Sequence, residues 1–212
     1  HADHTGGARE VLRNFAVGQL LVPPWDAQAS GETADWPRGL FDLAAEQGTD
    51  VITAEDGTVY PLGSGILTVL QSGESELYDT DDSSAHVNNA SLCTLFEAGN
   101  FRYLSTGDAE SAAEQRLVDR YGKALHATLF KAGHHGSSTS STEALLQVVQ
   151  PQAVAISCGL NNDYGHPHAR ALQRLTDAGA EIYRTDTMGT IIFTWQNDTL
   201  SAASADTLDA AA

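Results

Sequence analysis

Residues 127–140, ATLFKAGHHGSSTS, place two adjacent histidines directly after a short apolar segment. The apolar part has the length and composition of a buried strand. His134 and His135 follow where this strand ends, and Gly133 and Gly136 on either side allow close approach of the backbone. Two side chains of a metal-ligand type at a strand end make this segment a candidate part of a functional site.

The second half of the chain alternates strands with helices around this segment. The expected helices span residues 109–121, 142–149 and 169–178, and the expected strands span 127–133, 153–159, 180–185 and 190–195. Residues 91–98 and 101–106 form an expected hairpin that turns at Gly99-Asn100. This order predicts an α/β fold in which helices pack outside sheets.

The first half of the chain is less regular. Residues 7–20 begin as a helix and change to a strand pattern, and the prolines of residues 22–40 predict a loop. Residues 40–47 indicate a short helix. Residues 51–71, with their Asp-Gly and Gly-Ser-Gly turns, indicate a small antiparallel meander.

Length and composition fit one folded domain, which we expect over residues 1–200, with a disordered tail over 201–212. The acidic, serine-rich segment 72–90 indicates a mobile loop. Because no apolar run approaches the roughly 18 residues of a membrane helix, we expect the chain itself to be soluble. Cys93 and Cys158 lie in strand-like segments and are expected to be buried free thiols.

The net charge of −17, from 28 acidic and 11 basic residues, repels polyanions at long range. It counts against a free-standing nucleic-acid binder, because such a protein needs a basic face. A local basic patch could still form in the folded chain. Its members would be Arg102, Arg116, Arg120, Lys123, Lys131, Arg170, Arg174 and Arg184.

Six of the eight histidines lie in three short clusters at expected strand ends or loops. The clusters are residues 1–4 (HADH), 134–135 (HH) and 165–168 (GHPH), and Asp108 ends the segment LSTGD after another strand. Neutral imidazole and carboxylate are the usual ligands of Zn²⁺ and Mn²⁺, and a carboxylate can bridge two ions. One cluster alone would indicate ordinary loop histidines, but the coincidence of all of them predicts a metal site.

The ordered set of motifs resembles a known family. The motifs are HADHTGG (1–7), NNASL (88–92), LSTGDAE (104–110), KAGHHGSSTS (131–140), GLNNDYGHPH (159–168) and YRTDTMGTI (183–191). Together they resemble metallo-β-lactamase-fold hydrolases, in particular the C-terminal hydrolase domain of the ComEC family of bacterial DNA-uptake channel proteins. The resemblance covers nearly the whole chain, and HHGS, GHPH and RTD with GTI are its most specific parts when taken together.

The resemblance implies an αβ/βα sandwich with two divalent metal ions, Zn²⁺ or Mn²⁺, and no organic cofactor. His1 would bind the first metal ion. Asp3 and His4 would bind the second, with His134 joining them. Asp108 would bridge both ions.

The same resemblance implies roles around the metal ions. Asp108, His135 and His166 would be catalytic, and one of the two histidines would protonate the leaving oxygen. The expected substrate-binding residues are Asn88, Asn89, Ser91, Ser137 and His168.

The activity that the resemblance implies is metal-dependent phosphodiester hydrolysis. The protein would act as a nuclease during natural transformation, degrading one DNA strand while the other enters the cell. Its implied partners are DNA, single-stranded in particular, and the membrane channel portion of the parent protein. The implied location of the domain is the extracytoplasmic face of the cell membrane.

The family signature begins with a histidine two residues before His1, and the family's first strands precede it. The resemblance therefore implies an N-terminally truncated domain that lacks these first strands. We expect it to hold the second metal ion better than the first, because the first would lack a ligand.

Two other functions fit the sequence. Proteins of this fold also hydrolyse esters, thioesters, lactones and β-lactams, and a fold does not fix a substrate. The negative net charge of the chain favours a substrate other than DNA. The third alternative is a non-catalytic module associated with a membrane channel, in which the metal site has degenerated.

Overall fold

The structure is a computed structural model that describes residues 2–24, 32–73 and 87–205. The chain divides into two compact units, His1–Glu55 and Asp56–Ala212. Among the described residues, no helix has both the length and the apolar character needed to cross a membrane.

The first unit combines three helices with a two-stranded parallel sheet. Its elements are α1 (Ala2–Thr5), α2 (Ala8–Asn14), β1 (Gln19–Val22), α3 (Glu32–Glu46) and β2 (Asp50–Thr53). Leu12 of α2 packs with Leu40 and Ala44 of α3 in a small buried core. These two α3 residues are four apart and therefore share one face of the helix.

Two sequence expectations for the first unit are corrected by this arrangement. The loop expected over residues 22–40 is in part helix, because α3 begins at Glu32 and includes Pro37. Burial of the Leu40 face outweighs the backbone hydrogen bond that a proline cannot donate. Strand β2, which we expected to begin the antiparallel meander, instead pairs in parallel with β1.

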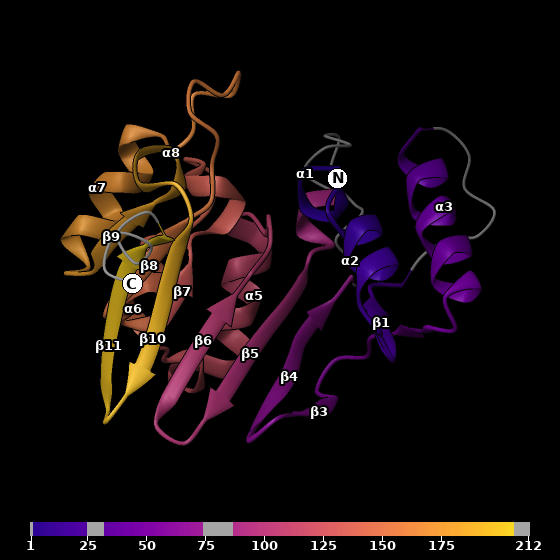
Figure 1. The fold of residues 1–212 in the computed structure, drawn as a ribbon. Helices are drawn as coiled ribbons and strands as arrows, with labels where there is room; N and C mark the ends of the chain where they lie inside the picture. Colours follow the sequence, from indigo (N-terminus) through magenta and orange to yellow (C-terminus); the bar gives the residue numbers. More distant parts are fainter. Residues whose placement is uncertain (1, 25–31, 74–86, 206–212) are drawn as a thin grey trace. The chain divides into compact units, whose positions relative to one another are not determined.

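The second unit contains a seven-stranded sheet in the order β3-β4-β5-β6-β7-β8-β9 (Figure 1). The strands are β3 (Val59–Leu62), β4 (Gly65–Ser72), β5 (Leu92–Ala98), β6 (Phe101–Ser105), β7 (Leu129–Lys131), β8 (Ala153–Ile156) and β9 (Glu181–Arg184). Pairing is antiparallel from β3 to β6 and parallel from β6 to β9. The carboxyl ends of β6, β7, β8 and β9 consequently meet at one edge of the sheet.

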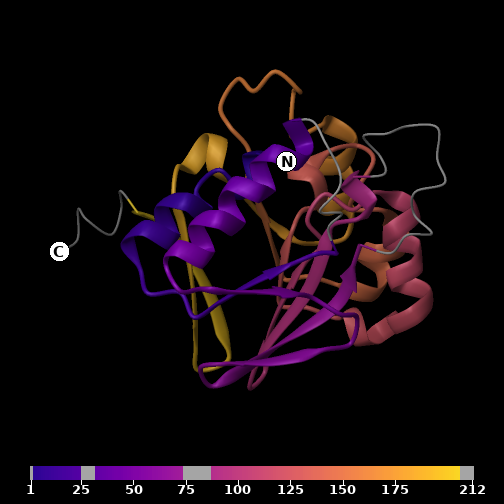
Figure 2. The same cartoon turned by 90° about the vertical axis from the view of Figure 1, so that its right-hand side faces the viewer.

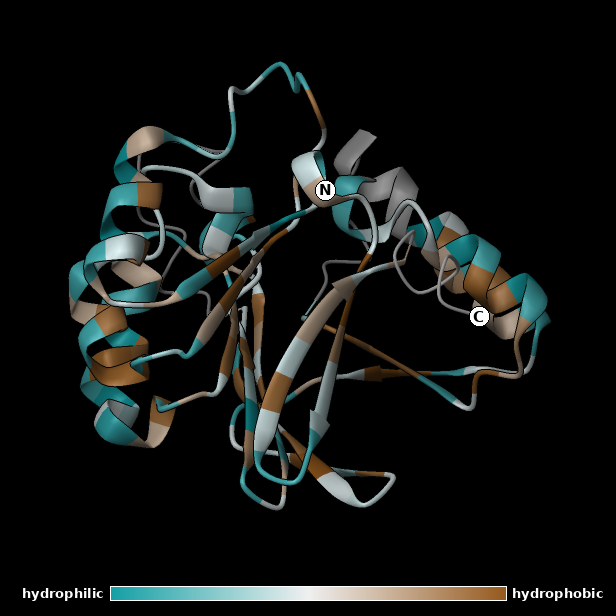
Figure 3. Cartoon of the chain, turned by 60° about the vertical axis from the view of Figure 1, so that its left-hand side comes forward, coloured by the Kyte–Doolittle hydropathy of each residue, from teal (hydrophilic) through white to brown (hydrophobic). Residues whose placement is uncertain are grey.

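Helices α5 (Ser111–Tyr121) and α6 (Glu143–Val149) cover one face of this sheet. The antiparallel hairpin of β10 (Ile191–Gln196) and β11 (Thr199–Ser204) lies on the other face (Figure 2). The core on the helix side is apolar and includes Phe130, Leu104 and Leu145. Figure 3 shows hydrophobic residues along the strands and mixed hydropathy on the helices, as expected for elements that bury one face.

Most expected elements of the second unit are present with small shifts at their ends. The hairpin turns at Gly99 and Asn100, and α7 (Ala169–Asp177) occupies the third expected helix. The expected disordered tail differs, because β11 continues to Ser204, and residues 206–212 lie outside the described residues. Most of the expected mobile segment, residues 74–86, also lies outside them.

The two cysteines are free, as expected, but only Cys93 is buried. Burial raises the pKa of the Cys93 thiol far above its usual range, so this thiol stays protonated. Cys158 is partly exposed at the end of β8.

A buried carboxylate of α5 holds the loop that leads into α6. Glu114 is fully buried and accepts hydrogen bonds from the backbone N–H groups of Ser141 (2.6 Å) and Thr142 (2.8 Å). Arg174 of α7 donates to the backbone carbonyls of Ser138, Ser140 and Ser141. Burial raises the pKa of the Glu114 carboxyl, while these N–H donors and the charge of Arg174 oppose the rise.

A second polar cluster ties the end of β9 to the end of β8. Thr185 in the short helix α8 (Thr185–Met188) accepts a hydrogen bond from the Cys158 N–H and donates to the Cys158 carbonyl. Arg184 and Asp186 form a two-bond ion pair of 3.0 and 2.6 Å. The RTD motif, residues 184–186, therefore has a structural role, because Thr185 holds the segment that follows β8.

We predict that Glu114→Ala lowers the free energy of unfolding by about 3 kcal/mol, because the N–H groups of Ser141 and Thr142 lose their acceptor and Arg174 loses a nearby opposite charge. Glu143→Ala is the matched control, since Glu143 is an exposed acid in the first turn of α6. Its loss should stay below about 1 kcal/mol. Urea denaturation measures both variants, and equal losses would contradict a special role for Glu114.

We predict a pH-dependent contribution from Asp186. The hydrogen bonds from Arg184 lower the pKa of this carboxyl, so its stabilising effect is present above the unfolded pKa of about 3.9. That effect is lost as the pH falls through the lower folded pKa. Asp186→Asn should cost about 1 kcal/mol at pH 7 and almost nothing near pH 2.5. A difference that stays constant across a pH series of denaturation curves would contradict this assignment.

Candidate metal centre

The two histidines after β7 have an unusual backbone conformation. His134 (φ 47°, ψ 49°) and His135 (φ 54°, ψ 24°) are both left-handed, within the short helical turn η3 (Gly133–Gly136). Residues other than glycine adopt this conformation at a cost of roughly 1–2 kcal/mol each. Two in succession indicate that the surrounding structure imposes the turn.

The flanking glycines explain how the turn fits. A Cβ atom at Gly133 would lie 2.9 Å from the Ser140 Cβ. Gly136 has a positive φ of 82°, and a Cβ atom there would lie 2.6 Å from the Pro167 Cβ. Both positions therefore need glycine, one because of close packing and the other because of packing and backbone conformation.

The turn directs both histidines to Asp108, which follows β6. Asp108 is only 4% exposed. The Nε2 atom of His135 lies 3.6 Å from Asp108 Oδ1, and the Nε2 atom of His134 lies 4.0 Å from Asp108 Oδ2. Each carboxylate oxygen thus faces one imidazole nitrogen.

The other ring nitrogens have contacts that fix the orientation of the rings. His135 Nδ1 lies 2.7 Å from the Ser157 carbonyl, to which it can only donate. His134 Nδ1 lies 3.5 Å from both Glu110 Oε1 and Thr139 Oγ1. With Nδ1 carrying the proton, Nε2 of each ring presents a lone pair toward the Asp108 carboxylate.

This arrangement fits a divalent metal ion. Metal-binding histidines commonly donate the second ring nitrogen to a carbonyl or a carboxylate, as His135 does to Ser157. A buried carboxylate between two Nε2 atoms is a donor set that suits Zn²⁺ or Mn²⁺. Asp108, His134 and His135, which all belong to the second unit, therefore form the candidate metal centre.

His166 lies beside the two metal-centre histidines. Its ring centroid is 5.4 Å from that of His134 and 6.2 Å from that of His135. Burial and the neighbouring histidines lower the pKa of His166 to about 4. Without a metal ion, His166 is therefore neutral at pH 7 and has a lone pair on one ring nitrogen.

The expected ligands near the N-terminus belong to the first unit. Asp3 and His4 lie in α1, with 3.9 Å between His4 Nε2 and Asp3 Oδ2. His1 lies outside the described residues. The three ligand assignments stay predictions.

Three of the expected substrate-binding residues hydrogen-bond to Asp108 or Glu110 in the loop after β6. Ser91 Oγ accepts from the Asp108 N–H (2.9 Å), and Asn89 Oδ1 accepts from the Glu110 N–H (3.0 Å). Asn88 donates from Nδ2 to Glu110 Oε1. These bonds favour a positioning role, and substrate contact stays a prediction for all three.

The other two expected substrate-binding residues lie in the loops around the turn. Ser137 is 4% exposed, and its hydroxyl is 3.1 Å from that of Thr139. His168 accepts from the Ser138 N–H through Nδ1 and lies 3.1 Å from the Tyr164 carbonyl through Nε2. Both ring nitrogens of His168 therefore have partners within the protein.

Sequence reasoning missed Glu110 and Glu114. Glu110 contacts His134 and accepts from Asn88. Its position two residues after Asp108 in LSTGDAE is the signal that could have indicated it. Glu114 carries no such signal, because an acid on a helix is usually exposed.

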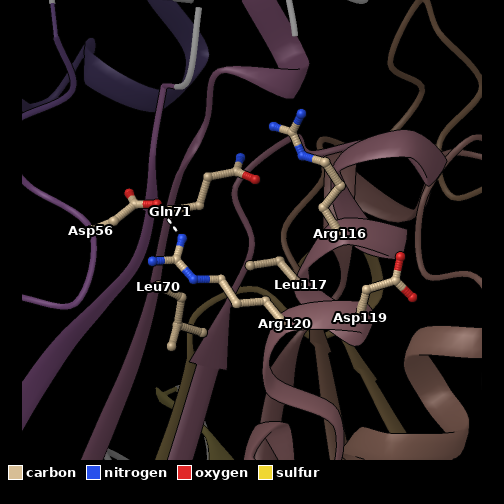
Figure 4. A pocket seen from close by; sticks show the side chains of 7 residues that line it. All are labelled: Asp56, Leu70, Gln71, Arg116, Leu117, Asp119 and Arg120. Atoms are coloured by element: carbon tan, nitrogen blue, oxygen red, sulfur yellow. Dashed lines mark hydrogen bonds and ion pairs between the residues drawn. The ribbon is translucent and has the colours of Figure 1, made fainter. Parts of the chain in front are cut away.

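Several of the basic residues that could have formed a patch are paired with groups of the protein itself. Arg102 pairs with Glu97, Arg184 pairs with Asp186, and Arg120 pairs with Asp56. Arg116 and Arg120 line a pocket of about 340 Å³, and Figure 4 shows their side chains there. The other lining residues are Asp56, Leu70, Gln71, Leu117 and Asp119, so two acids balance the two arginines.

The chain is similar to three proteins linked by name to competence or recombination. It is 30% identical to ComE operon protein 3 of Bacillus subtilis over 92% of this chain and 24% of that protein. It is 33% identical to recombination protein 2 of Haemophilus influenzae over 97% of this chain and 22% of that protein. It is 36% identical to competence protein ComA of Neisseria gonorrhoeae over 50% of this chain and 16% of that protein. The chain thus spans about a quarter or less of these relatives.

Comparison with solved structures supports the fold. The diiron β-hydroxylase CmlA of Streptomyces venezuelae superposes with a TM-score of 0.54 at 15% identity, over 87% of this chain and 42% of that chain. A family model described as the metallo-beta-lactamase superfamily matches residues 1–159. The expected fold class is confirmed, and the chain belongs to the metallo-beta-lactamase superfamily.

Proposed function

We propose that this domain is a metal-dependent phosphodiester hydrolase that acts as a DNA nuclease. The observation that carries the proposal is the buried Asp108 carboxylate, which faces the Nε2 atoms of His134 and His135. The similarity to named competence proteins supports DNA as the substrate.

The residues of both units have separate roles in this proposal. Asp108 and His134 would hold divalent metal ions, and the family resemblance implies ligand roles for Asp3 and His4 of α1 as well. Two divalent ions, Zn²⁺ or Mn²⁺, would supply Lewis-acid activation of water and of a phosphoryl oxygen. The Ser157 carbonyl accepts the Nδ1 proton of His135, so Nε2 would either bind a metal ion through its lone pair or, when it also carries a proton, donate to the leaving oxygen.

The biological setting is part of the proposal. The relatives include a competence protein, a ComE operon protein and a recombination protein, and this chain matches about a quarter or less of each. We infer that the domain acts beside a membrane channel, at the extracytoplasmic face, on single-stranded DNA during uptake.

Hydrolysis of a smaller substrate is the second candidate. The net charge of −17 and the ion pairs of Arg102, Arg120 and Arg184 favour it, because they leave little positive charge for a DNA backbone. Parallel assays with bis(p-nitrophenyl) phosphate, DNA and nitrocefin separate the two. Turnover of nitrocefin without turnover of either phosphodiester would overturn the nuclease proposal.

We predict that Asp108→Ala lowers the rate of bis(p-nitrophenyl) phosphate cleavage at least about 100-fold, because the shared metal ligand is lost. The variant should still fold, since Ser91 contacts the Asp108 backbone N–H rather than its carboxylate. His126→Ala is the control, because His126 is an exposed histidine of another loop. Retained cleavage by Asp108→Ala would contradict the metal site.

We predict that Mn²⁺ or Zn²⁺ stabilises the metal-stripped protein. A ligand at 100 times its dissociation constant adds about 2.7 kcal/mol to the free energy of unfolding. The midpoint temperature of thermal unfolding should therefore rise with metal concentration in the parent chain and in His126→Ala. The rise should be smaller in Asp108→Ala, and an identical rise in all three proteins would place the metal elsewhere.

A further inference from the structure

The loop between β8 and α7 is held in a defined shape. Asn162 donates from Nδ2 to the carbonyls of Gly159 (2.9 Å) and His166 (2.6 Å), and its Oδ1 accepts from the His166 N–H. The Gly165 N–H donates to the Asn162 carbonyl. A single asparagine thus closes the loop on itself, and Figures 1 and 2 show the loop extending beyond the carboxyl end of β8.

The same loop is attached to the metal-centre turn. His168 accepts from the Ser138 N–H through Nδ1, and its backbone N–H donates to the Gly136 carbonyl. Its Nε2 lies 3.1 Å from the Tyr164 carbonyl. The position of Tyr164 is therefore fixed relative to His134 and His135.

Tyr164 is an exposed aromatic residue on this ordered loop. It is 77% exposed, and nearby Leu160 is 72% exposed. An exposed apolar residue alone carries no functional meaning. Here, however, the Tyr164 ring is nearly parallel to the His166 ring, with centroids 5.7 Å apart and 19° between the planes.

The stacked rings lead from solvent to the metal centre. The His166 ring is in turn nearly parallel to the His135 ring, at 6.2 Å and 21°. His135 faces Asp108. A planar group that stacks on Tyr164 would therefore lie at the end of a row of rings that reaches the candidate metal centre.

We propose that Tyr164 is a stacking platform for a nucleobase of single-stranded nucleic acid whose backbone crosses the metal centre. The proposal rests on the proposed function and adds a specific subsite to it. Aromatic side chains bind single strands by stacking on the bases, and this stacking is tolerant of sequence. A base in a duplex is already stacked on its neighbours, so the platform selects unpaired nucleotides.

Stacking also fits the charge of the chain. A protein with a net charge of −17 gains little from attraction to phosphates. Contact between a base and an aromatic ring needs no positive charge. The platform therefore provides affinity for a single strand where the ion-paired arginines do not.

The test is equilibrium binding of a fluorescently labelled thymidine oligonucleotide to the metal-stripped 212-residue chain. Tyr164→Ala should weaken binding between about 5-fold and about 100-fold, the range of one base–aromatic stack. Tyr164→Phe should bind like the parent chain, because it keeps the ring. The loss should be similar at low and high salt, since it is not electrostatic.

Two controls separate stacking from a general effect on the loop. An oligonucleotide with abasic positions should bind the parent chain and Tyr164→Ala equally. Leu160→Ala, which removes an equally exposed apolar side chain from the same loop, should change binding less than about twofold.

The outcomes for the platform and for the nuclease are distinguishable. Equal binding of the thymidine strand by the parent chain and Tyr164→Ala would overturn the platform, and so would a parent chain that binds no strand. If the parent chain binds the strand through Tyr164 but cleaves neither DNA nor bis(p-nitrophenyl) phosphate with added Mn²⁺ or Zn²⁺, the nuclease proposal fails and the platform stands.

Discussion

The left-handed pair His134-His135 is the constraint on which the rest of the site depends. In a continuing strand, successive side chains point to opposite faces, so two adjacent histidines could not serve one carboxylate. The turn η3 breaks that alternation and presents both Nε2 atoms to Asp108. The backbone strain of this turn is roughly 1–2 kcal/mol per residue, and it must be offset by contacts elsewhere.

Those contacts come from several directions. The His134 N–H donates to the Gly107 carbonyl, which links the turn to the loop that carries Asp108. The Gly133 N–H donates to Ser141 Oγ, and the Ser141 N–H donates to Glu114. Glu114 thus acts on the turn through the loop after it, which explains why a carboxylate is retained where burial opposes its charge. The strained turn and the buried acid are two parts of one arrangement.

The sequence was informative where local pattern and chemistry coincide. Apolar segments followed by Asp108, His134 and His166 predicted both the strands and the residues that the structure gathers at the sheet edge. This worked because parallel strands bring their carboxyl ends together, so residues far apart in sequence share one edge.

Other features depend on tertiary contacts and leave no local signal. Helix α3 includes Pro37 because the Leu40 face is buried, although proline predicts a break. Strand β2 pairs with β1 rather than with its sequence neighbour, and β11 extends into residues with the composition of a tail. The roles of Asn89, Ser91 and His168 as supports became visible only from their hydrogen-bond partners.

The acidity of the chain bears on what kind of substrate recognition the fold can support. Long-range attraction of a polyanion requires a basic face, and the charges of Arg102 and Arg120 are each paired with an acidic side chain of the same chain. Under the proposed function, a substrate strand would be held by short-range contacts, which are divalent ions at the phosphate and planar groups at the base. Both contacts act only within a few ångströms, so they add affinity only once a strand has reached the site.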